Sequence, residues 1–126
     1  MEILDIIIYN NKGQQVVSKS QVFNEFSKAA GFFPLISVYM TKLSTINLPL
    51  LILEKHKIVF QRLREITGAI ILNARENEEH ALQLLNDLLN KILLNGLENA
   101  NKIIKEFSYK DYKNENVDSR DFFKDF

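Results

Sequence analysis

The chain opens on an apolar run that predicts a buried strand followed by a hairpin. Residues 3–9 are aliphatic or aromatic except for Asp5, and a strand covered on both faces has this near-continuous apolar pattern. Residues 10–13 read Asn-Asn-Lys-Gly, a turn in which Gly13 suits a left-handed position. The return run over residues 14–18 is more polar. We therefore predict a central first strand and a second strand at a sheet edge.

Residues 20–43 carry an apolar stripe with helical spacing. Ser20 is a suitable helix cap, and apolar side chains then recur at steps of three and four residues. Gly31 and Pro34 interrupt the pattern, because proline removes a backbone donor and clashes with the preceding turn. We predict one bent helix, with a short break near Phe32 as the alternative. The stripe consists of Val22, Phe26, Ala29, Phe33, Ile36 and Met40.

Three apolar runs follow between residues 48 and 72. Pro49 lies near the start of the first run, residues 48–53, which suits an edge strand and argues against a central one. The charged residues 54–57 make a turn before the runs 58–63 and 66–72. We predict three successive antiparallel strands. For residues 58–65 a short helix is the alternative.

The chain after residue 73 has a strong helical pattern. Asn73 or Asn77 can cap this helix, and three glutamates lie where the positive end of the helix dipole favours them. Asn95 and Gly96 are a stop signal, and a second amphipathic stripe follows over residues 97–107. The acidic residues are Glu76, Glu78 and Glu79, and the first apolar stripe is Ala81, Leu82, Leu85, Leu88, Leu89 and Ile92.

This order of elements predicts one α+β domain. The chain has 126 residues, enough for a single core of its own. A five-stranded antiparallel sheet, with one helix on one face and two C-terminal helices on the other, would bury the first strand on both faces. We assign the domain to residues 1–108 and a charged tail to residues 109–126. That tail ends in three phenylalanines suited to docking a short helical turn: Phe122, Phe123 and Phe126.

Charge and composition narrow the class of protein. Sixteen Lys and Arg balance sixteen Asp and Glu, and cysteine is absent. A net charge of zero supplies no bulk field to capture nucleic acid or an anionic membrane, and without cysteine there is no disulfide or thiolate ligand. Glu2 and Asp5 argue against a signal peptide, and no apolar stretch approaches the roughly 20 residues of a membrane-spanning helix. We expect a cytoplasmic protein.

No residue pattern indicates catalysis, a cofactor or a metal. The four glycines are isolated from one another, whereas a phosphate-binding loop needs several close together. His56 and His80 show no ligand spacing. The acidic cluster at residues 76–79 is explained by its place at a helix start. The cationic residues between positions 55 and 64 fit a solvated strand face better than contacts to phosphates or lipid headgroups. We predict a protein that is not an enzyme.

The element order and the residues that carry it resemble the longin domain. The similarity rests on the hairpin of residues 3–18 with its Asn-Asn-Lys-Gly turn, the meander of residues 48–72 and the leucine-rich helix of residues 78–93. It spans most of the chain. The related roadblock fold begins with a helix, whereas the extra helix here is C-terminal. Residues 119–123, Ser-Arg-Asp-Phe-Phe, resemble the segment that opens the last helix of longin subunits in the TRAPP transport tether. Because no heptad segment and membrane anchor follow the predicted domain in this sequence, we do not expect a longin-type SNARE protein.

The resemblance implies a non-enzymatic interaction module. Such a domain pairs with itself or with another longin or roadblock domain, binds a small GTPase, or serves as a subunit of a vesicle coat or tether. It associates with membranes through these partners. The longin sheet has its second and third strands at the edges, here residues 14–18 and 48–53, and an exposed apolar edge recruits a partner strand. The expected interface combines the third strand with one flank of the first helix: Phe32, Leu35, Tyr39, Leu48, Leu50 and Ile52.

The alternative function is that of a small-molecule-sensing domain, because profilin-like and sensory α+β folds have similar sheets. That function needs a cavity. The large side chains available to line or fill one are Phe23, Phe26, Phe33 and Phe60. Close packing is the default for a protein interior, so the interaction module remains the first prediction.

Overall fold

The computed structural model describes residues 3–24, 30–42 and 50–106, which form an α+β fold around a five-stranded antiparallel sheet. The strand order is β2-β1-β5-β4-β3, so the second and third strands are at the edges, as the resemblance implied. The strands are β1 (Ile3–Tyr9), β2 (Gln15–Ser18), β3 (Leu50–Ile52), β4 (His56–Leu63) and β5 (Ile66–Asn73). The helical elements are α1 (Lys19–Val22), η1 (Ala30–Phe32), α2 (Phe33–Lys42), α3 (Glu78–Asn95) and η2 (Leu97–Asn99), followed by a helix over residues 100–106.

The prediction of a central first strand and a meander is confirmed. β1 pairs with β2 on one side and β5 on the other, and β5 pairs with β4 along its whole length. The segment around residues 58–65 is therefore strand and turn, and the helical alternative is wrong. At the hairpin between β1 and β2, Gly13 has the expected left-handed conformation, with a φ of 74°.

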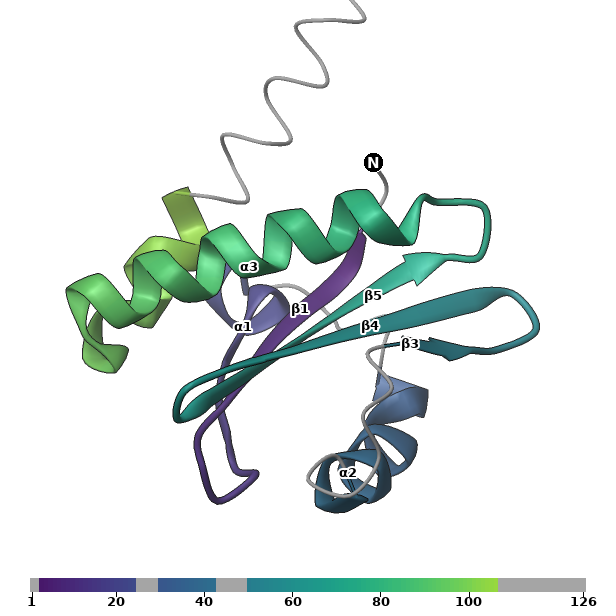
Figure 1. Ribbon diagram of the computed structural model, residues 1–126, viewed down its shortest axis with the longest axis horizontal. Coiled ribbons are helices and arrows are strands. Elements are labelled where there is room, and N and C mark those ends of the chain that lie inside the picture. The colour runs from purple at the N-terminus through teal and green to yellow at the C-terminus, as the bar shows by residue number, and fades with distance from the viewer. Residues whose placement is uncertain (1–2, 25–29, 43–49, 107–126) are drawn as a thin grey trace, which may run out of the picture.

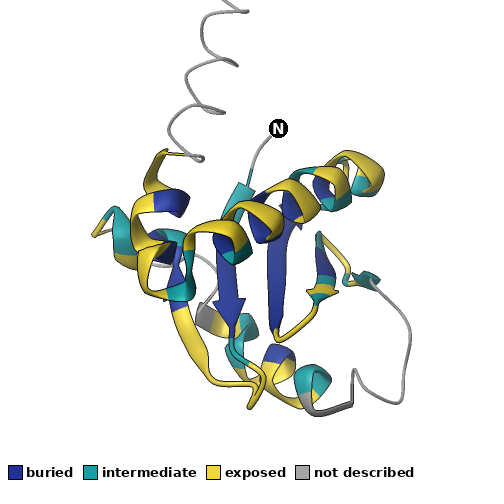
Figure 2. Ribbon diagram, turned by 60° about the vertical axis from the view of Figure 1, so that its left-hand side comes forward, coloured by how far each residue is buried: buried dark blue, intermediate teal, exposed yellow. Residues whose placement is uncertain are grey.

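One face of the sheet holds the larger core, under α3 and the helix of residues 100–106. α3 begins at Asn77, whose side-chain oxygen accepts hydrogen bonds from the amides of Glu79 and His80, so Asn77 and not Asn73 is the cap. The inner side of α3 is buried and its outer side exposed (Figure 2). The helix lies very close to β5 at Gly68, where an added Cβ would lie 2.5 Å from Leu85 Cδ1. A side chain at residue 68 would therefore force the side chain of Leu85 to move.

The opposite face holds a smaller core under α2 (Figure 1). Ile36 of α2 is fully buried there against side chains of β1, β4 and β5. Because residues alternate along a strand, each central strand supplies one row of side chains to each core. The buried members under α2 are Ile7, Tyr9, Ile36, Ile58, Phe60, Ala69 and Ile71.

The predicted single bent helix over residues 20–43 is wrong. α1 is only four residues long and ends at Phe23, after which Asn24 has a left-handed φ of 53°. The next helical turn described begins at Ala30 and leads into α2, with Pro34 in its first turn, where its missing amide proton costs no hydrogen bond. The stripe positions Phe26 and Ala29 lie outside the described residues. The alternative, a short break near Phe32, is also misplaced, because Phe32 ends the helical turn η1 that leads directly into α2, whereas α1 ends at Phe23.

The two halves of the expected helix cover different faces of the sheet. Val22 of α1 packs against the core under α3, whereas Phe32 and Phe33 pack against the core under α2. α1 is held by the buried carboxylate of Asp5, which accepts hydrogen bonds from the amide and the hydroxyl of Ser20 at 3.2 and 2.9 Å. Ser18 caps α1 through a bond from the amide of Gln21. The cap predicted at Ser20 is therefore at Ser18.

The predictions for the C-terminal part of the chain can be compared with the structure only as far as residue 106. The stop at Gly96 is confirmed, and the second helical stripe is present as η2 and the helix of residues 100–106. The tail of residues 109–126 and its resemblance segment, residues 119–123, lie outside the described residues. Among the described helices, none has the length and apolar content needed to cross a membrane.

Candidate protein-interaction edge

The candidate site is the free edge of β3. Over the described residues, β3 is the last strand of the sheet and pairs only with β4, with Leu51 opposite Ile58 and Ile52 opposite Lys57. β3 has three residues, and the two expected residues before it, Leu48 and Pro49, lie outside the described residues. Of the predicted strand residues 48–53, Leu50–Ile52 form β3 and Leu53 lies directly after it.

The register fixes which backbone groups of β3 face outward. Leu53 donates its amide proton to the carbonyl of His56 at 2.8 Å, and directly opposed residues in an antiparallel ladder alternate between hydrogen-bonded and non-hydrogen-bonded pairs. Leu51 and Ile58 are thus a bonded pair. Leu50 and Ile52 belong to the other class, so their N–H and C=O groups point away from β4. An incoming strand could form backbone hydrogen bonds with these groups.

The side chains of β3 are apolar on both faces of the sheet. Leu50 packs against the core under α3, and Ile52, two residues on, projects on the same side and is 66 % exposed. Leu51 and Leu53 pack against the core under α2. These two leucines were not among the predicted interface residues. Alternation along the strand separates them from Leu50 and Ile52, but an unbroken apolar run does not reveal which set faces which helix.

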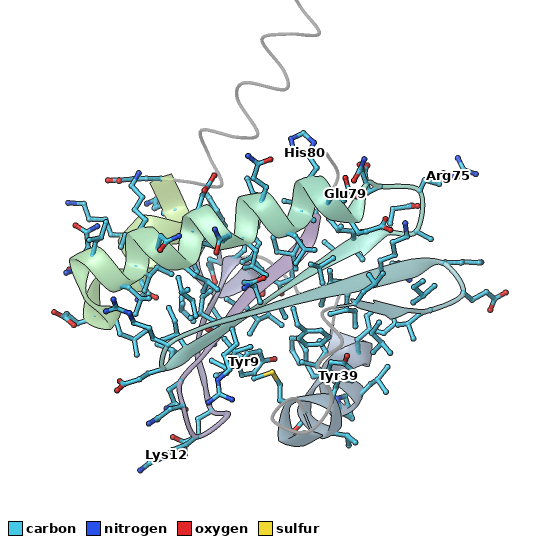
Figure 3. The ribbon with its side chains drawn as sticks, in the orientation of Figure 1. Tyr9, Lys12, Tyr39, Arg75, Glu79 and His80 are labelled. Atoms are coloured by element: carbon cyan, nitrogen blue, oxygen red, sulfur yellow. The ribbon has the colours of Figure 1, made fainter. Side chains whose placement is uncertain are left out.

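Two of the three predicted helix residues are partly buried in the core under α2. The ring of Phe32 lies 5.0 Å from that of His56, and the ring of Tyr39 stacks on Phe60 at 4.5 Å between centroids. Tyr39 projects from α2 toward the sheet (Figure 3), and burial raises the pKa of its phenol. Phe60 is fully buried in this stack, so the side chain expected either to line or to fill a cavity here fills the core.

The third helix residue, Leu35, is at the surface. It is 40 % exposed, and Val38, one turn further along α2, is 55 % exposed. Phe32, Leu35 and Tyr39 share one flank of the helix because they are three and four residues apart. Since both rings on this flank touch β4, Leu35 lies on the side of α2 nearer β4 than β1. The sequence prediction missed Val38, which points away from the core stripe.

The structure does not bring the predicted interface residues into one patch. Leu50 and Ile52 project on the α3 side of the sheet, whereas Phe32, Leu35 and Tyr39 belong to the α2 side. What joins the two groups is the edge of β3 itself. A partner strand added there would meet Ile52 on one face, and a partner helix beside that strand would meet Leu35 on the other.

One charged side chain next to this edge, that of Lys57, is bonded to the start of α3. Lys57 of β4 donates to the carboxylate of Glu78 at 2.9 Å and to the backbone carbonyl of Glu76 at 3.1 Å. The hydrogen bond from Lys57 lowers the pKa of Glu78. This pair fixes the start of α3 against the sheet, which agrees with a structural role for the acidic cluster.

The two histidines lie in different parts of the structure. His56 packs against Phe32 at the β3 end of the sheet, and His80 is exposed on α3, where it points away from the sheet together with Glu79 (Figure 3). Within residues 3–24, 30–42 and 50–106, no three His, Asp or Glu side chains come together in a metal-binding group. The sequence matches no protein-family model and no curated protein.

Proposed function

We propose that this chain is a non-enzymatic, longin-like interaction module that pairs through the β3 edge with a longin or roadblock domain, its own or another. In this function it binds a small GTPase or serves as a subunit of a vesicle coat or tether. The observation that carries the proposal is the open apolar edge of β3. Two residues turn their backbone groups outward there, and the side chain of Ile52 is 66 % exposed.

Sheet edges in proteins that stay monomeric are normally protected by charges, bulges or covering segments, because open edges promote association. Over the described residues β3 has no charged side chain and no irregular register. The order of the five strands supports the longin resemblance, since the resemblance implied that this strand would be at an edge. An edge of this kind favours recognition by strand addition, with main-chain hydrogen bonds for affinity and side-chain contacts for specificity.

The experiment captures partners from a lysate of the source organism on the immobilised full-length protein. Parallel captures contain GDP or a non-hydrolysable GTP analogue, and bound proteins are identified by mass spectrometry. We expect enrichment of a small GTPase, dependent on the nucleotide, or of a protein with a longin or roadblock domain. If neither class is enriched, the proposal is wrong, and a thermal-shift screen of metabolites then tests the ligand-sensing alternative.

Two variants locate the contact. Ile52→Lys places a charge on the open edge, and Val16→Lys places the same charge on the other edge strand, where Val16 is 37 % exposed. We expect Ile52→Lys to weaken partner capture about tenfold or more, equivalent to about 1.4 kcal/mol, and Val16→Lys to leave it unchanged. Equal capture by both variants, with unchanged circular dichroism, would exclude the β3 edge.

Leu35 is the better probe of the α2 flank. Tyr39→Glu would place a charge in the stack with Phe60 and disturb the core. Leu35→Glu changes a side chain that is 40 % exposed, so the fold should survive. Loss of capture in Leu35→Glu would extend the contact from β3 onto α2, and retention would confine the contact to the strand.

A further inference from the structure

A second surface lies at the opposite edge of the sheet. β2, α1 and the helix of residues 100–106 border an open groove of about 610 Å³, lined by Val16, Gln21, Val22, Asn101, Lys102 and Lys105. The two valines form its apolar floor. Val22 is half-buried against the core under α3, and Val16 is 37 % exposed. Cavities of this size hold one or a few side chains, or a small ligand.

The rim of the groove is cationic. Lys102 and Lys105 are exposed and form no ion pair with another described residue. The nearest acidic residue before them in the chain is Glu98 of η2. Its carboxylate is folded against Gly96, where an added Cβ would lie 2.6 Å from its oxygen. Lysine stems extend apolar surface while their ammonium groups stay in water. The groove therefore suits a segment that combines apolar side chains with carboxylates.

We propose that residues 118–126 of the same chain occupy this groove as a short helix. In this arrangement Phe122 and Phe126 cover the valine floor, and aspartates pair with Lys102 and Lys105. The proposal concerns the β2 edge and is independent of partner binding at β3.

The sequence of this segment has the required chemistry. Its acidic residues, Asp118, Asp121 and Asp125, are three and four residues apart and share one face of a helix. At about 100° per residue, Phe122 and Phe126 lie beside that acidic face. The cationic residues of the segment lie on the opposite side of such a helix: Arg120 and Lys124. The helix would thus direct carboxylates and phenylalanines together toward the groove and its positive charges outward.

The length of the chain permits this docking. The described helix ends at residue 106, one residue after Lys105 of the rim. Residues 107–117 separate it from the docking segment, and eleven residues span at most about 36–40 Å when extended. From residue 106 back to Lys102 is about 6 Å along a helix, at 1.5 Å per residue. The three phenylalanines of the segment can each bury about 150–250 Å² of mostly apolar surface, and this burial favours docking.

The absence of cysteine from the sequence provides a direct test with a single spin label. Arg120→Cys places a nitroxide on the side of the segment that faces away from the groove, in the full-length protein. Because a docked segment occupies the groove for most of the time, we expect the amide signals of Val16 and Val22 to lose about half their NMR intensity or more. Those residues are the reporters because they are remote in sequence from the label.

A charge reversal and a matched control test the specific contacts. Adding Lys102→Glu and Lys105→Glu should restore the signals of Val16 and Val22. The same two charge changes at other exposed lysines, Lys12→Glu with Lys91→Glu, should leave the broadening unchanged. Phe122→Ser with Phe126→Ser should also restore the signals, because it removes the apolar contact and keeps the aspartates.

Three results would overturn the proposal. The first is the absence of broadening at Val16 and Val22. The second is broadening that persists in the Lys102→Glu, Lys105→Glu variant with circular dichroism unchanged. The third comes from a mixture of spin-labelled chain without ¹⁵N and unlabelled ¹⁵N chain. Broadening in that mixture equal to the broadening within one chain would assign the groove to a second copy of the protein.

Discussion

The two edges of the sheet solve the problem of unpaired backbone in different ways. β2 is polar at its start, has an irregular register opposite Tyr9, and leads directly into α1, which is tied to β1 through Asp5. β3 is apolar, regular in register, and lacks such a tie within the described residues. Bulges and polar side chains are the usual protection of an edge. β2 has this protection and β3 lacks it over the described residues, which supports the proposal that a partner binds at β3.

Among the substitutions that test this difference between the two edges, we expect the largest loss of stability from removing the Asp5 carboxylate, which holds α1 beside β2. Asp5→Ala leaves the amide and hydroxyl of Ser20 and the amide of Ile6 without their acceptor. Each buried unsatisfied donor costs about 1–3 kcal/mol, so we expect a loss of about 4 kcal/mol in the free energy of unfolding, measured by urea denaturation. Asp5→Asn keeps one acceptor oxygen and should lose less. A loss below about 1 kcal/mol for Asp5→Ala would show that the carboxylate does not hold α1.

A pair of proline substitutions tests which groups of β3 face outward. Leu51→Pro removes an amide that bonds to β4, and a proline that breaks a backbone hydrogen bond costs about 3 kcal/mol. Ile52→Pro removes an amide that points to the open edge, where proline is tolerated, so its cost should be under about 1 kcal/mol. Urea denaturation of both variants measures the difference. Equal destabilisation would show that the alternation assigned to β3 is wrong.

Tyr9 gives a pH-dependent test next to the β2 edge, because it lies opposite Gln15. Burial, with a smaller contribution from the Asp5 carboxylate, raises the pKa of its phenol from 10.0 to about 12. The unfolded chain releases this proton first as the pH rises. The stability contributed by Tyr9 is therefore complete below pH 10 and is lost between pH 10 and 12, by about 2–3 kcal/mol in total.

Denaturation of the wild type and of Tyr9→Phe across this pH range measures the effect of Tyr9. The variant should lose less stability than the wild type as the pH rises, since it has no proton to release at this position. Burial raises the pKa of Tyr39 in the same direction, so some decline should remain. Identical pH profiles for the two proteins would contradict the burial of Tyr9.

Much of the fold can be predicted from local sequence patterns, and the predictions that failed did so for a physical reason. The continuous apolar run of β1 and the leucine stripe of α3 fixed these elements to within two residues. The bent helix failed because an apolar stripe has the same spacing whether its two halves face one core or two. Val22 and Ile36 belong to that stripe yet pack on opposite faces of the sheet. The left-handed turn at Asn24 leaves no trace in the hydrophobic pattern.

The candidate site was predictable in residue type and less so in arrangement. The apolar third strand is an edge strand, as expected, and Leu35 and Ile52 are exposed. Phe32 and Tyr39 contribute to the core under α2. Large aromatic side chains beside the apolar stripe allow a short helix to cover more of the sheet, so such residues need not form an interface. Leu48 lies outside the described residues. The groove at β2 brings together residues about 80 positions apart in the sequence, which no local pattern predicts.

The most direct test of the β3 edge is amide hydrogen exchange of the full-length protein, alone and bound to the partner recovered by capture. Peptides that cover β3 are compared with peptides that cover β2. Strand addition would pair the outward amides of Leu50 and Ile52, so we predict slower exchange in β3 on binding and unchanged exchange in β2. Unchanged exchange in β3, with protection elsewhere on the bound protein, would contradict the proposal that this strand is the interaction edge.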